Sequence, residues 1–311
     1  MFGSKKWDPK DKHIYITGGS QGLGLALARL LVKRGAHVSI VARNAEKLEK
    51  AKKEIEAARA SDSQRVLSFS FSLDNASESA AALKAASDAH GGRAPDAVFT
   101  CAGASKPMFF LDMEEQDLTK GMVDGYWVQA WTALAAAKAM AKQGVKGKIV
   151  LVSSTLGYMS FVGYASYSPA KHALRGLADT LRSELLLYGI DVHCFFPPTM
   201  FTPGYDEESK SKPAITKKIE ETDDGLTAEQ AALGLFHGVE KNQPHITADL
   251  ITSLFHASTR GSAPRNNAFV ETILDFVALI GVPIWRSGVD KQVLAHREEH
   301  QGYLQKKGFF S

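Results

Sequence analysis

The chain has 311 residues, of which 44% are hydrophobic and 23% charged. This composition is typical of a globular protein with ample apolar material for a core. The formal net charge of +3 is too small to indicate a nucleic-acid partner, and the sequence holds no long basic run with interleaved aromatic residues. Both cysteines, Cys101 and Cys194, lie in apolar strand-like stretches, so we expect buried free thiols and neither a disulfide nor a metal site. No apolar signal-peptide core precedes the first predicted strand, which favours a location that faces the cytosol.

Short apolar runs alternate with helical patterns over the first two thirds of the chain. The runs predict strands at residues 12–19, 36–43, 65–73, 96–103, 147–154 and 190–198. The helical patterns cover residues 24–35, 44–60, 77–90, 115–143 and 167–189, and Asn44 is placed to cap the second of them. Such alternation requires right-handed crossovers and a parallel sheet with helices on both faces. We therefore expect a Rossmann-type, doubly wound α/β fold of about seven strands, with its ligand beyond the carboxyl ends of the strands.

A glycine-rich turn, TGGSQGLG, follows the first predicted strand. Gly18, Gly22 and Gly24 allow a tight turn and a close approach of the backbone to a pyrophosphate. The next helix offers its free N–H groups to that anion. A glycine pattern alone can be an ordinary turn, but this one follows a strand and opens a helix. The turn, with Ser20 and Gln21, therefore predicts a dinucleotide site.

The end of the second strand indicates which dinucleotide binds. An NAD site usually has an acidic residue there for the ribose 2′-hydroxyl. This chain has Ala42 and Arg43 instead, with Lys47 one helical turn further on. Arg43 can pair with a 2′-phosphate, and Ser20 can add a hydrogen bond. The alternative is a solvated surface arginine, but the missing acid independently favours NADP(H).

Ser154, Tyr167 and Lys171 form a candidate catalytic group. A spacing of four puts Tyr167 and Lys171 on one face of a helix, and Ser154 ends the fifth strand beside that face. Tyr167 would act as general acid toward a forming alkoxide, and Lys171 would lower the pKa of its phenol and hold the ribose. Ser154 would hydrogen-bond the substrate oxygen. The plain alternative is an amphipathic helix face, and the preceding glycine turn and Ser154 argue against it.

These motifs together, TGGSQGLG, CAG, SS and YSPAK, resemble the short-chain dehydrogenase/reductase superfamily over roughly residues 10–248. The resemblance implies hydride delivery from the nicotinamide to a carbonyl carbon held against Tyr167. It also implies further cofactor contacts at Leu73, Ala102, Gly103, Pro197, Thr202 and at Tyr167 and Lys171 themselves.

The sequence departs from this family pattern in two places. Gly125 stands where the family commonly has an asparagine that helps a water-linked proton relay, so Tyr126 or a bound water would have to substitute. The third strand ends in Ser72 and Leu73, with Asp74 too late to replace the usual acid at the adenine.

The segment PPTMFTPGYDEE begins the family's substrate lid, which we place at residues 198–226. Its composition predicts irregular structure, with a Thr-Pro-Gly turn in which Gly204 is free to adopt positive φ. The segment resembles the 3-ketodihydrosphingosine reductases, in a fungal form. That resemblance implies NADPH-dependent reduction of a long-chain 2-amino-3-ketone on the cytosolic face of the endoplasmic reticulum membrane. Asp206, Glu207 and Glu208 would then be candidates to meet the substrate ammonium, or simply solvated charges.

Residues 249–311 form an extension beyond the reductase domain, which we place at residues 1–248. The stretch 269–285 begins as an amphipathic helix and becomes wholly apolar from Phe276 to Trp285. It is short for a membrane span and holds Gly281 and Pro283, so a segment lying in or dipping into the membrane is favoured over a core helix or dimer interface. Trp285 and Arg286 are typical of an interfacial anchor.

Two other functions remain open at this point. A reductase of another lipophilic ketone, a steroid or a 3-ketoacyl lipid, fits the candidate catalytic residues equally well. A non-catalytic NADPH-binding scaffold fits only the departure at Gly125. By analogy with the superfamily, we expect a homodimer or homotetramer.

Overall fold

The computed structural model describes residues 6–221 and 223–307. Seven strands form one sheet in the order β3-β2-β1-β4-β5-β6-β9, and every neighbouring pair is parallel. Their bounds are β1 His13–Thr17, β2 His37–Ala42, β3 Val66–Ser70, β4 Ala97–Thr100, β5 Lys148–Val152, β6 Asp191–Phe196 and β9 His245–Thr247. The order reverses between β1 and β4, and such a switch point opens a crevice at the carboxyl ends of the strands. The predicted doubly wound fold is confirmed.

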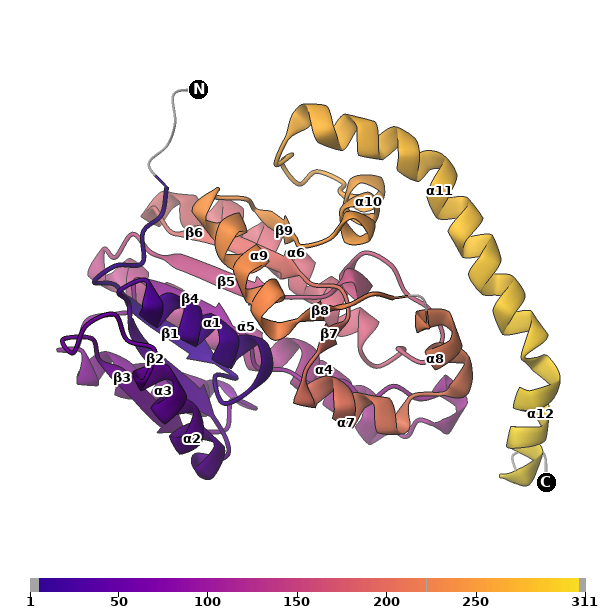
Figure 1. The fold of residues 1–311 in the computed structure, drawn as a ribbon, viewed down its shortest axis with the longest axis horizontal. Helices are drawn as coiled ribbons and strands as arrows, with labels where there is room; N and C mark the ends of the chain where they lie inside the picture. The colour runs from indigo at the N-terminus through magenta and orange to yellow at the C-terminus, as the bar shows by residue number, and fades with distance from the viewer. Residues whose placement is uncertain (1–5, 222, 308–311) are drawn as a thin grey trace.

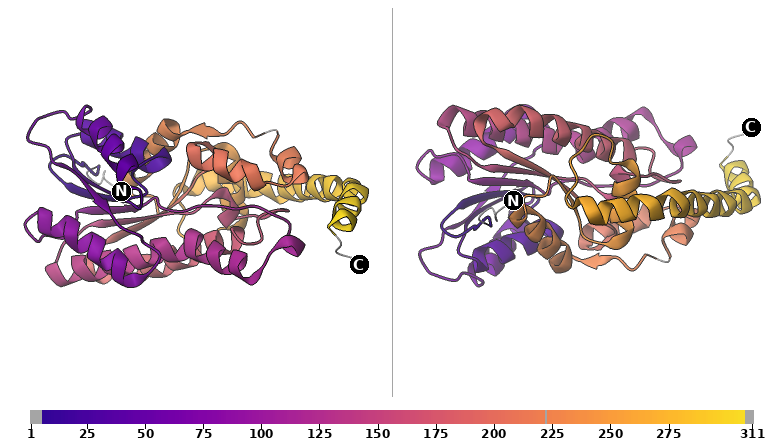
Figure 2. Two further views of the ribbon diagram at one scale, coloured as in Figure 1. Left: turned by 90° about the horizontal axis from the view of Figure 1, so that it is seen from below. Right: turned by 90° about the horizontal axis from the view of Figure 1, so that it is seen from above.

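Helices cover both faces of this sheet (Figures 1 and 2). One face carries α1 Gly22–Lys33, α2 Ala45–Glu56 and α9 Ala228–Glu240, and the other carries α3 Ala76–Ala89, α5 Val128–Gln143 and α6 Ser168–Glu184. Each of the two helical layers packs on one face of the sheet and forms its own apolar core there. Strand β1 contributes side chains to both cores. Ile14 and Ile16 point into one core and Tyr15 into the other, because successive side chains of a strand alternate between faces. All three side chains are fully buried.

The predicted elements are present, with shifts at their ends. Asn44 caps α2 as expected, because its side chain accepts a hydrogen bond from the Lys47 backbone N–H at 2.8 Å. The third strand stops at Ser70, three residues before its predicted end. The long helix predicted over 115–143 consists of α4 Glu115–Met122, a π-helical turn Val123–Trp127 and α5.

The lid is helical, so the prediction of an irregular segment with a turn at Gly204 is wrong. After a short strand, β7 Met200–Phe201, the chain forms α7 Pro203–Ser211 and α8 Ala214–Glu220 and returns through β8 Leu226–Thr227. Thr202 is the N-cap of α7 and its hydroxyl accepts from the Tyr205 N–H. Pro203 occupies the first helical position, where its fixed φ and missing N–H cost nothing. The proline that indicated a turn in fact starts a helix.

Three helices follow the sheet: α10 Leu250–Thr259, α11 Ala268–Ala295 and α12 Arg297–Lys306 (Figure 1). Phe255 of α10 still belongs to one of the two cores. Helix α11 continues through Gly281 and Pro283 to a length of 28 residues, so the helix extends ten residues beyond the end of the apolar run at Trp285. Within the described residues, α11 is the one helix that is long and apolar enough to cross a membrane, judged by length and composition alone.

Candidate active site

The glycine turn between β1 and α1 forms a cradle that leaves no room for side chains. Gly18 and Gly22 adopt positive φ, at 67° and 54°. A Cβ on Gly18 would lie 2.8 Å from the Ala102 backbone nitrogen, and one on Gly24 would lie 2.4 Å from the Gly18 carbonyl oxygen. The side chain of Gln21, the N-cap residue of α1, makes no capping hydrogen bond, so the first N–H groups of the helix remain open to an anion. The cradle therefore fits a dinucleotide pyrophosphate.

The residues expected around a 2′-phosphate meet beside this cradle. Gly18 donates its N–H to the Val41 carbonyl at 2.7 Å, which fixes the turn against the end of β2. Lys47 reaches back from α2 and donates to the Gln21 side chain at 3.2 Å. Arg43 is exposed next to them, and within the described residues its side chain has no ion pair or hydrogen bond. A guanidinium and an ammonium thus lie beside the cradle, where the sequence predicts the 2′-phosphate.

The other predicted cofactor residues surround the same crevice. Ala102 donates its N–H to the Thr17 hydroxyl at 3.1 Å, and Gly103 lies beside the Lys171 ammonium. Thr202 closes the opposite side, because a Cβ on Gly22 would lie 3.4 Å from the Thr202 side chain. The remaining members are Ser20, which is partly buried in the turn, Leu73, which is buried after β3, and Pro197, whose carbonyl accepts from Thr155.

The structure brings Ser154, Tyr167 and Lys171 together. Ser154 follows β5, and its hydroxyl accepts from the Leu156 N–H at 3.2 Å and lies near the Tyr167 phenol. Tyr167 and Lys171 lie one turn apart at the start of α6, with the ammonium 5.3 Å from the centre of the phenol ring. The ammonium donates to the Val152 carbonyl at 2.9 Å. Two helical residues and a strand end therefore present a hydroxyl, a phenol and an ammonium to one point.

The pKa of the Tyr167 phenol is shifted in the opposite direction from the one that the sequence predicts. Burial and then the nearby Glu208 carboxylate raise the pKa of the Tyr167 phenol above its usual range, whereas the neighbouring Ser154 side chain lowers that pKa. We expected Lys171 to bring that pKa toward neutrality, but its ammonium is held at the Val152 carbonyl, over the ring. Burial lowers the pKa of Lys171 to about 8. At neutral pH the phenol keeps its proton, so Tyr167 is poised to donate one.

Gly125 lies in the π-helical turn and cannot be replaced by asparagine in this conformation. A Cβ at this position would lie 2.6 Å from the Ala170 Cβ, on the turn of α6 between Tyr167 and Lys171. Its role in this structure is close packing of the two helices. The neighbouring Asp124 carbonyl oxygen lies 3.2 Å from the position of a Cβ on Gly103.

A buried polar network, which the sequence did not predict, joins the lid to the catalytic segment. The Tyr164 hydroxyl lies 2.7 Å from Glu208 and 2.6 Å from Glu220. The Lys212 ammonium, whose side chain is 1% exposed, pairs with both carboxylates at 3.2 and 2.5 Å. The Tyr164 ring lies 5.9 Å from the Tyr167 ring. The sequence signal was the Glu-Glu pair itself, because two members of the network, Tyr164 and Glu220, come from outside α7.

The three lid acids therefore have different environments. Glu208 is mostly buried in this network, whereas Glu207 is exposed and pairs with Lys210 at 2.5 Å. Asp206 is also exposed, in the first turn of α7. Glu208 alone of the three faces the catalytic residues. Of the two cysteines, both free as expected, Cys194 is buried and Cys101 is partly buried.

A family model described as "short chain dehydrogenase" matches residues 12–213, which include both the cradle and the candidate catalytic group. Among solved structures, a short-chain dehydrogenase/reductase from Mycobacterium ulcerans superposes with a TM-score of 0.68 at 22% identity, covering 78% of this chain and 89% of that one. Levodione reductase gives a TM-score of 0.69 at 22% identity, covering 77% and 96%. The chain belongs to the short-chain dehydrogenase family, whose cofactor is a nicotinamide dinucleotide.

Similar curated proteins indicate which branch of the family the chain resembles. A 3-ketodihydrosphingosine reductase from Cryptococcus neoformans is 45% identical over 309 residues, covering 99% of this chain and 92% of that protein. A 3-dehydrosphinganine reductase from Danio rerio is 38% identical over 221 residues, covering 71% of this chain and 66% of that protein. The resemblance noted in the lid thus extends over nearly the whole chain, which groups with the 3-ketodihydrosphingosine reductases.

Proposed function

We propose that this protein reduces 3-ketosphinganine to sphinganine with NADPH at the cytosolic face of the endoplasmic reticulum membrane. The observation that carries the proposal is the assembly of Ser154, Tyr167 and Lys171 between a dinucleotide cradle and a lid, in a chain similar along its whole length to named reductases. Bound NADPH would supply the hydride for this reaction. The residues of the chain would bind the ketone and donate the proton.

Tyr167 is the proton donor in this mechanism. Ser154 hydrogen-bonds the ketone oxygen and holds it against the Tyr167 phenol, which keeps its proton at neutral pH because burial raises its pKa. As negative charge develops on that oxygen, the phenol proton moves to it. The Lys171 ammonium lies on the same face and stabilises the phenolate that remains. The buried Glu208 carboxylate is suited to hold the substrate ammonium next to the ketone.

The preference for NADPH over NADH is supported by charge. Arg43 and Lys47 offer two cations where the adenosine 2′-phosphate would lie, and the strand end has no carboxylate to repel it. The cradle residues, from Gly18 to Gly24 with Leu73, Ala102, Gly103, Pro197 and Thr202, would hold the remainder of the cofactor.

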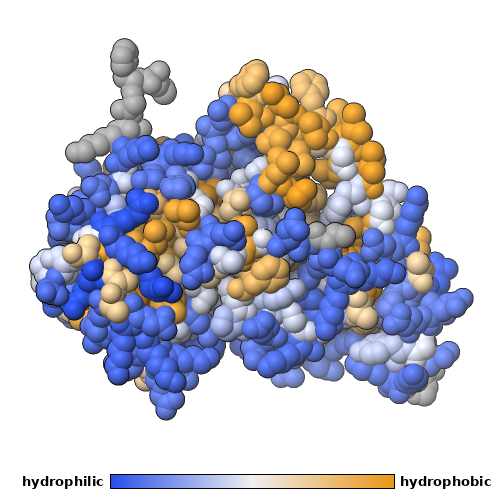
Figure 3. Space-filling view, in the orientation of Figure 1, coloured by the Kyte–Doolittle hydropathy of each residue, from blue (hydrophilic) through white to orange (hydrophobic). Residues whose placement is uncertain are grey.

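Membrane association is supported by the orientation of α11. Its polar side faces the protein body, where Arg260 pairs with the buried Glu271 at 3.2 Å and with Asp275 at 3.4 Å. Its apolar side faces outward: Phe269, Phe276, Leu279, Ile280 and Ile284 are 67–76% exposed. Together with the exposed Leu250 and Ile251 of α10 they form the apolar face of the C-terminal extension (Figure 3). Exposure of so many large apolar side chains to water is unfavourable, whereas a lipid surface would bury them.

The contacts of α11 favour a helix lying in the surface over one that spans it. Trp285, predicted as an interfacial anchor, packs on Phe255 with the ring centres 4.9 Å apart. Arg286 donates to the Ser160 carbonyl at 2.6 Å. Beyond the helix end, Tyr303 of α12 donates to Asp112. Both ends of α11 are thus fixed to one catalytic body, and a helix held in this way cannot cross to the other side of a bilayer.

We propose the division of the chain that the sequence predicts. We keep a reductase domain over residues 1–248, with its lid at 198–226, and a membrane-associating extension over 249–311. A homodimer or homotetramer is supported by exposed apolar side chains on the α4–α5 surface. There Trp127 stacks on Trp131 with ring centres 4.6 Å apart, and Leu134 is 43% exposed.

The proposal is tested by NADPH oxidation with purified full-length protein in mild detergent. We expect turnover with 3-ketosphinganine, a much slower rate with NADH, and sphinganine as the product identified by mass spectrometry. Steroid ketones and 3-ketoacyl lipids serve as comparison substrates. Faster turnover of one of these than of 3-ketosphinganine would overturn the substrate assignment, and NADPH binding without any turnover would favour a scaffold.

A further inference from the structure

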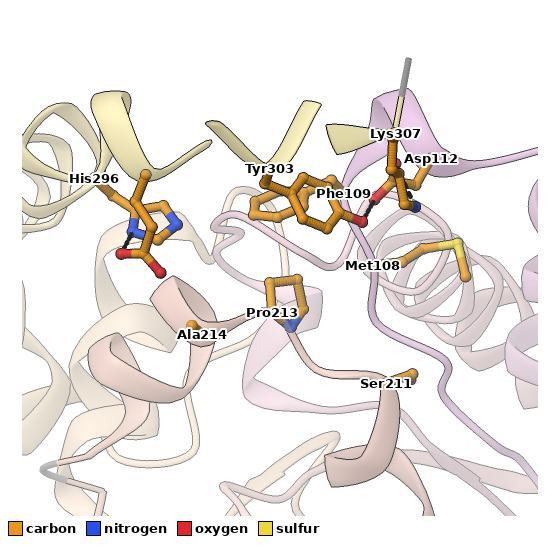
Figure 4. A pocket seen from close by; sticks show the side chains of 10 residues that line it. Met108, Phe109, Asp112, Ser211, Pro213, Ala214, His296, Tyr303 and Lys307 are labelled. Carbon is orange, nitrogen blue, oxygen red and sulfur yellow. Dashed lines mark hydrogen bonds and ion pairs between the residues drawn. The ribbon is translucent and has the colours of Figure 1, made fainter. Parts of the chain in front are cut away.

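A cavity of about 470 Å³ lies between the lid and the C-terminal helices, outside the candidate catalytic group (Figure 4). Three separate segments build it: residues 108–112 before α4, the junction of α7 and α8, and the end of α11 with α12. Figure 4 shows Phe109 and Tyr303 on one side and Pro213 and Ala214 on the other. The volume lies within the ~300–1,000 Å³ range usual for ligand pockets.

The cavity is lined both by apolar residues and by polar or charged residues, and its charges are paired. Met108, Phe109, Pro213 and Ala214 supply much of the wall. Phe109 packs against Tyr303, with ring centres 5.7 Å apart. The charged residues pair with one another: Asp112 with Lys307 at 3.0 Å, and His296 with Glu299 at 2.9 Å. A site of this kind favours an uncharged, flexible ligand.

A short chain of contacts connects the cavity to Tyr167. Met108 donates its N–H to the Gly163 carbonyl at 2.9 Å. A Cβ on Gly163 would lie 3.5 Å from the Pro213 ring, so this glycine lies against the cavity wall. The next residue, Tyr164, places its ring 5.9 Å from Tyr167. Gly163 and Tyr164 therefore lie between the cavity wall and Tyr167, and a long ligand with its head at Tyr167 would pass beside Tyr164 to reach the cavity.

We propose that this cavity receives the alkyl chain of the substrate while the 2-amino-3-ketone head lies at Tyr167. This inference rests on the proposed function, because a long saturated chain is the part of a 3-keto base that the apolar wall of Met108, Phe109, Pro213 and Ala214 would contact. Val293 and Leu294 near the end of α11 are exposed, and His296, two residues further on, lines the cavity.

The test is the dependence of kcat/KM on chain length, measured with 2-amino-3-ketones of increasing length. Each methylene buried in the cavity is expected to raise kcat/KM by roughly fourfold in the wild type. Ala214→Trp fills the cavity and should remove most of that increase, with the shortest ketone turned over at the wild-type rate. Dividing each variant value by the wild-type value for the same ketone cancels the partition of long chains into detergent.

Two further variants make the test specific. Met108→Glu puts a charge in the same wall and should also abolish the gain with length. Lys217→Trp adds the same bulk to an exposed position of α8 outside the cavity and should leave the gain intact. Turnover of the shortest ketone shows that each variant is folded.

The possible failures are distinct. An unchanged chain-length dependence in both cavity variants, or an equal loss for all lengths, would overturn the cavity assignment and leave the proposed function standing. Failure of the wild type to reduce any 2-amino-3-ketone would overturn the proposed function, and the cavity assignment with it.

Discussion

Charging the outward side of α11 should release the protein from membranes without unfolding it. We consider the double substitution Phe276→Asp and Ile280→Asp. These side chains are 70% and 67% exposed, and complete burial of such a side chain contributes ~1.5–3 kcal/mol. If lipid covers only the exposed part, each contributes about 1–2 kcal/mol to membrane binding. Removing both should weaken partition by roughly 30- to 1,000-fold.

The assay is flotation of purified full-length protein with neutral phospholipid vesicles, together with thermal unfolding. The wild type should float with the vesicles and the double variant should remain in the soluble fraction, with an unchanged melting temperature. Gln292→Glu adds a negative charge at an exposed polar position of the same helix and should float like the wild type. Flotation of the double variant would refute membrane binding through this side, and a large loss of thermal stability would show that protein covers it.

Four further predictions concern the catalytic site. Tyr167→Phe should retain NADPH binding, measured by fluorescence titration, and lose about 10²–10⁴-fold in kcat; retained turnover would remove Tyr167 from the mechanism. Arg43→Ala should raise KM for NADPH by about 10- to 100-fold and leave KM for NADH nearly unchanged, and equal increases would contradict the 2′-phosphate assignment. Lys171 carries its charge below its pKa of about 8, so kcat should fall as pH rises through that value. Lys171→Arg stays charged and should lack this decline. A wild-type profile that is flat to pH 10 would exclude a role of the Lys171 charge in stabilising the phenolate. Glu208→Gln should raise KM for the amino ketone about tenfold or more and leave KM for an analogue without the amine unchanged. Glu207→Gln, at an exposed position, should change neither KM value. Equal increases for both ketones in Glu208→Gln would indicate a structural role.

The parts of the fold that the sequence predicts well are those in which local pattern and tertiary environment agree. The first six strands are apolar runs because helices bury both faces of a parallel sheet. The glycine turn and the Tyr167–Lys171 spacing are visible because each depends on residues within a few positions of one another. Because all strands of the sheet are parallel, these motifs then meet at the carboxyl ends of the strands.

The seventh strand and the lid show where local pattern is insufficient. Strand β9 has only His245–Thr247, too short for a recognisable alternation. In the lid, Thr202 and Pro203 are a sound signal for a helix start, but proline also occurs in turns and the residues after it have a weak apolar pattern. The short helices of the lid are held by contacts with Tyr164, which lies 44 residues from Glu208 in the chain.

The C-terminal extension could not be oriented from its sequence. Its apolar run indicates a helix, but whether the polar side faces solvent or protein depends on Arg260 and Arg265, which bind Asp275 from outside the helix. The π-helical turn at Gly125 is equally hidden, because the demand for a residue without a side chain comes from Ala170 in another helix.

The most direct test of the proposed reaction is isotope transfer from NADPH deuterated at both C4 positions to 3-ketosphinganine. We expect one deuterium per molecule of sphinganine, located at C3 by fragmentation in the mass spectrometer, and no such product with Tyr167→Phe under the same conditions. Sphinganine without deuterium at C3, or no sphinganine from a protein that binds NADPH, would contradict it.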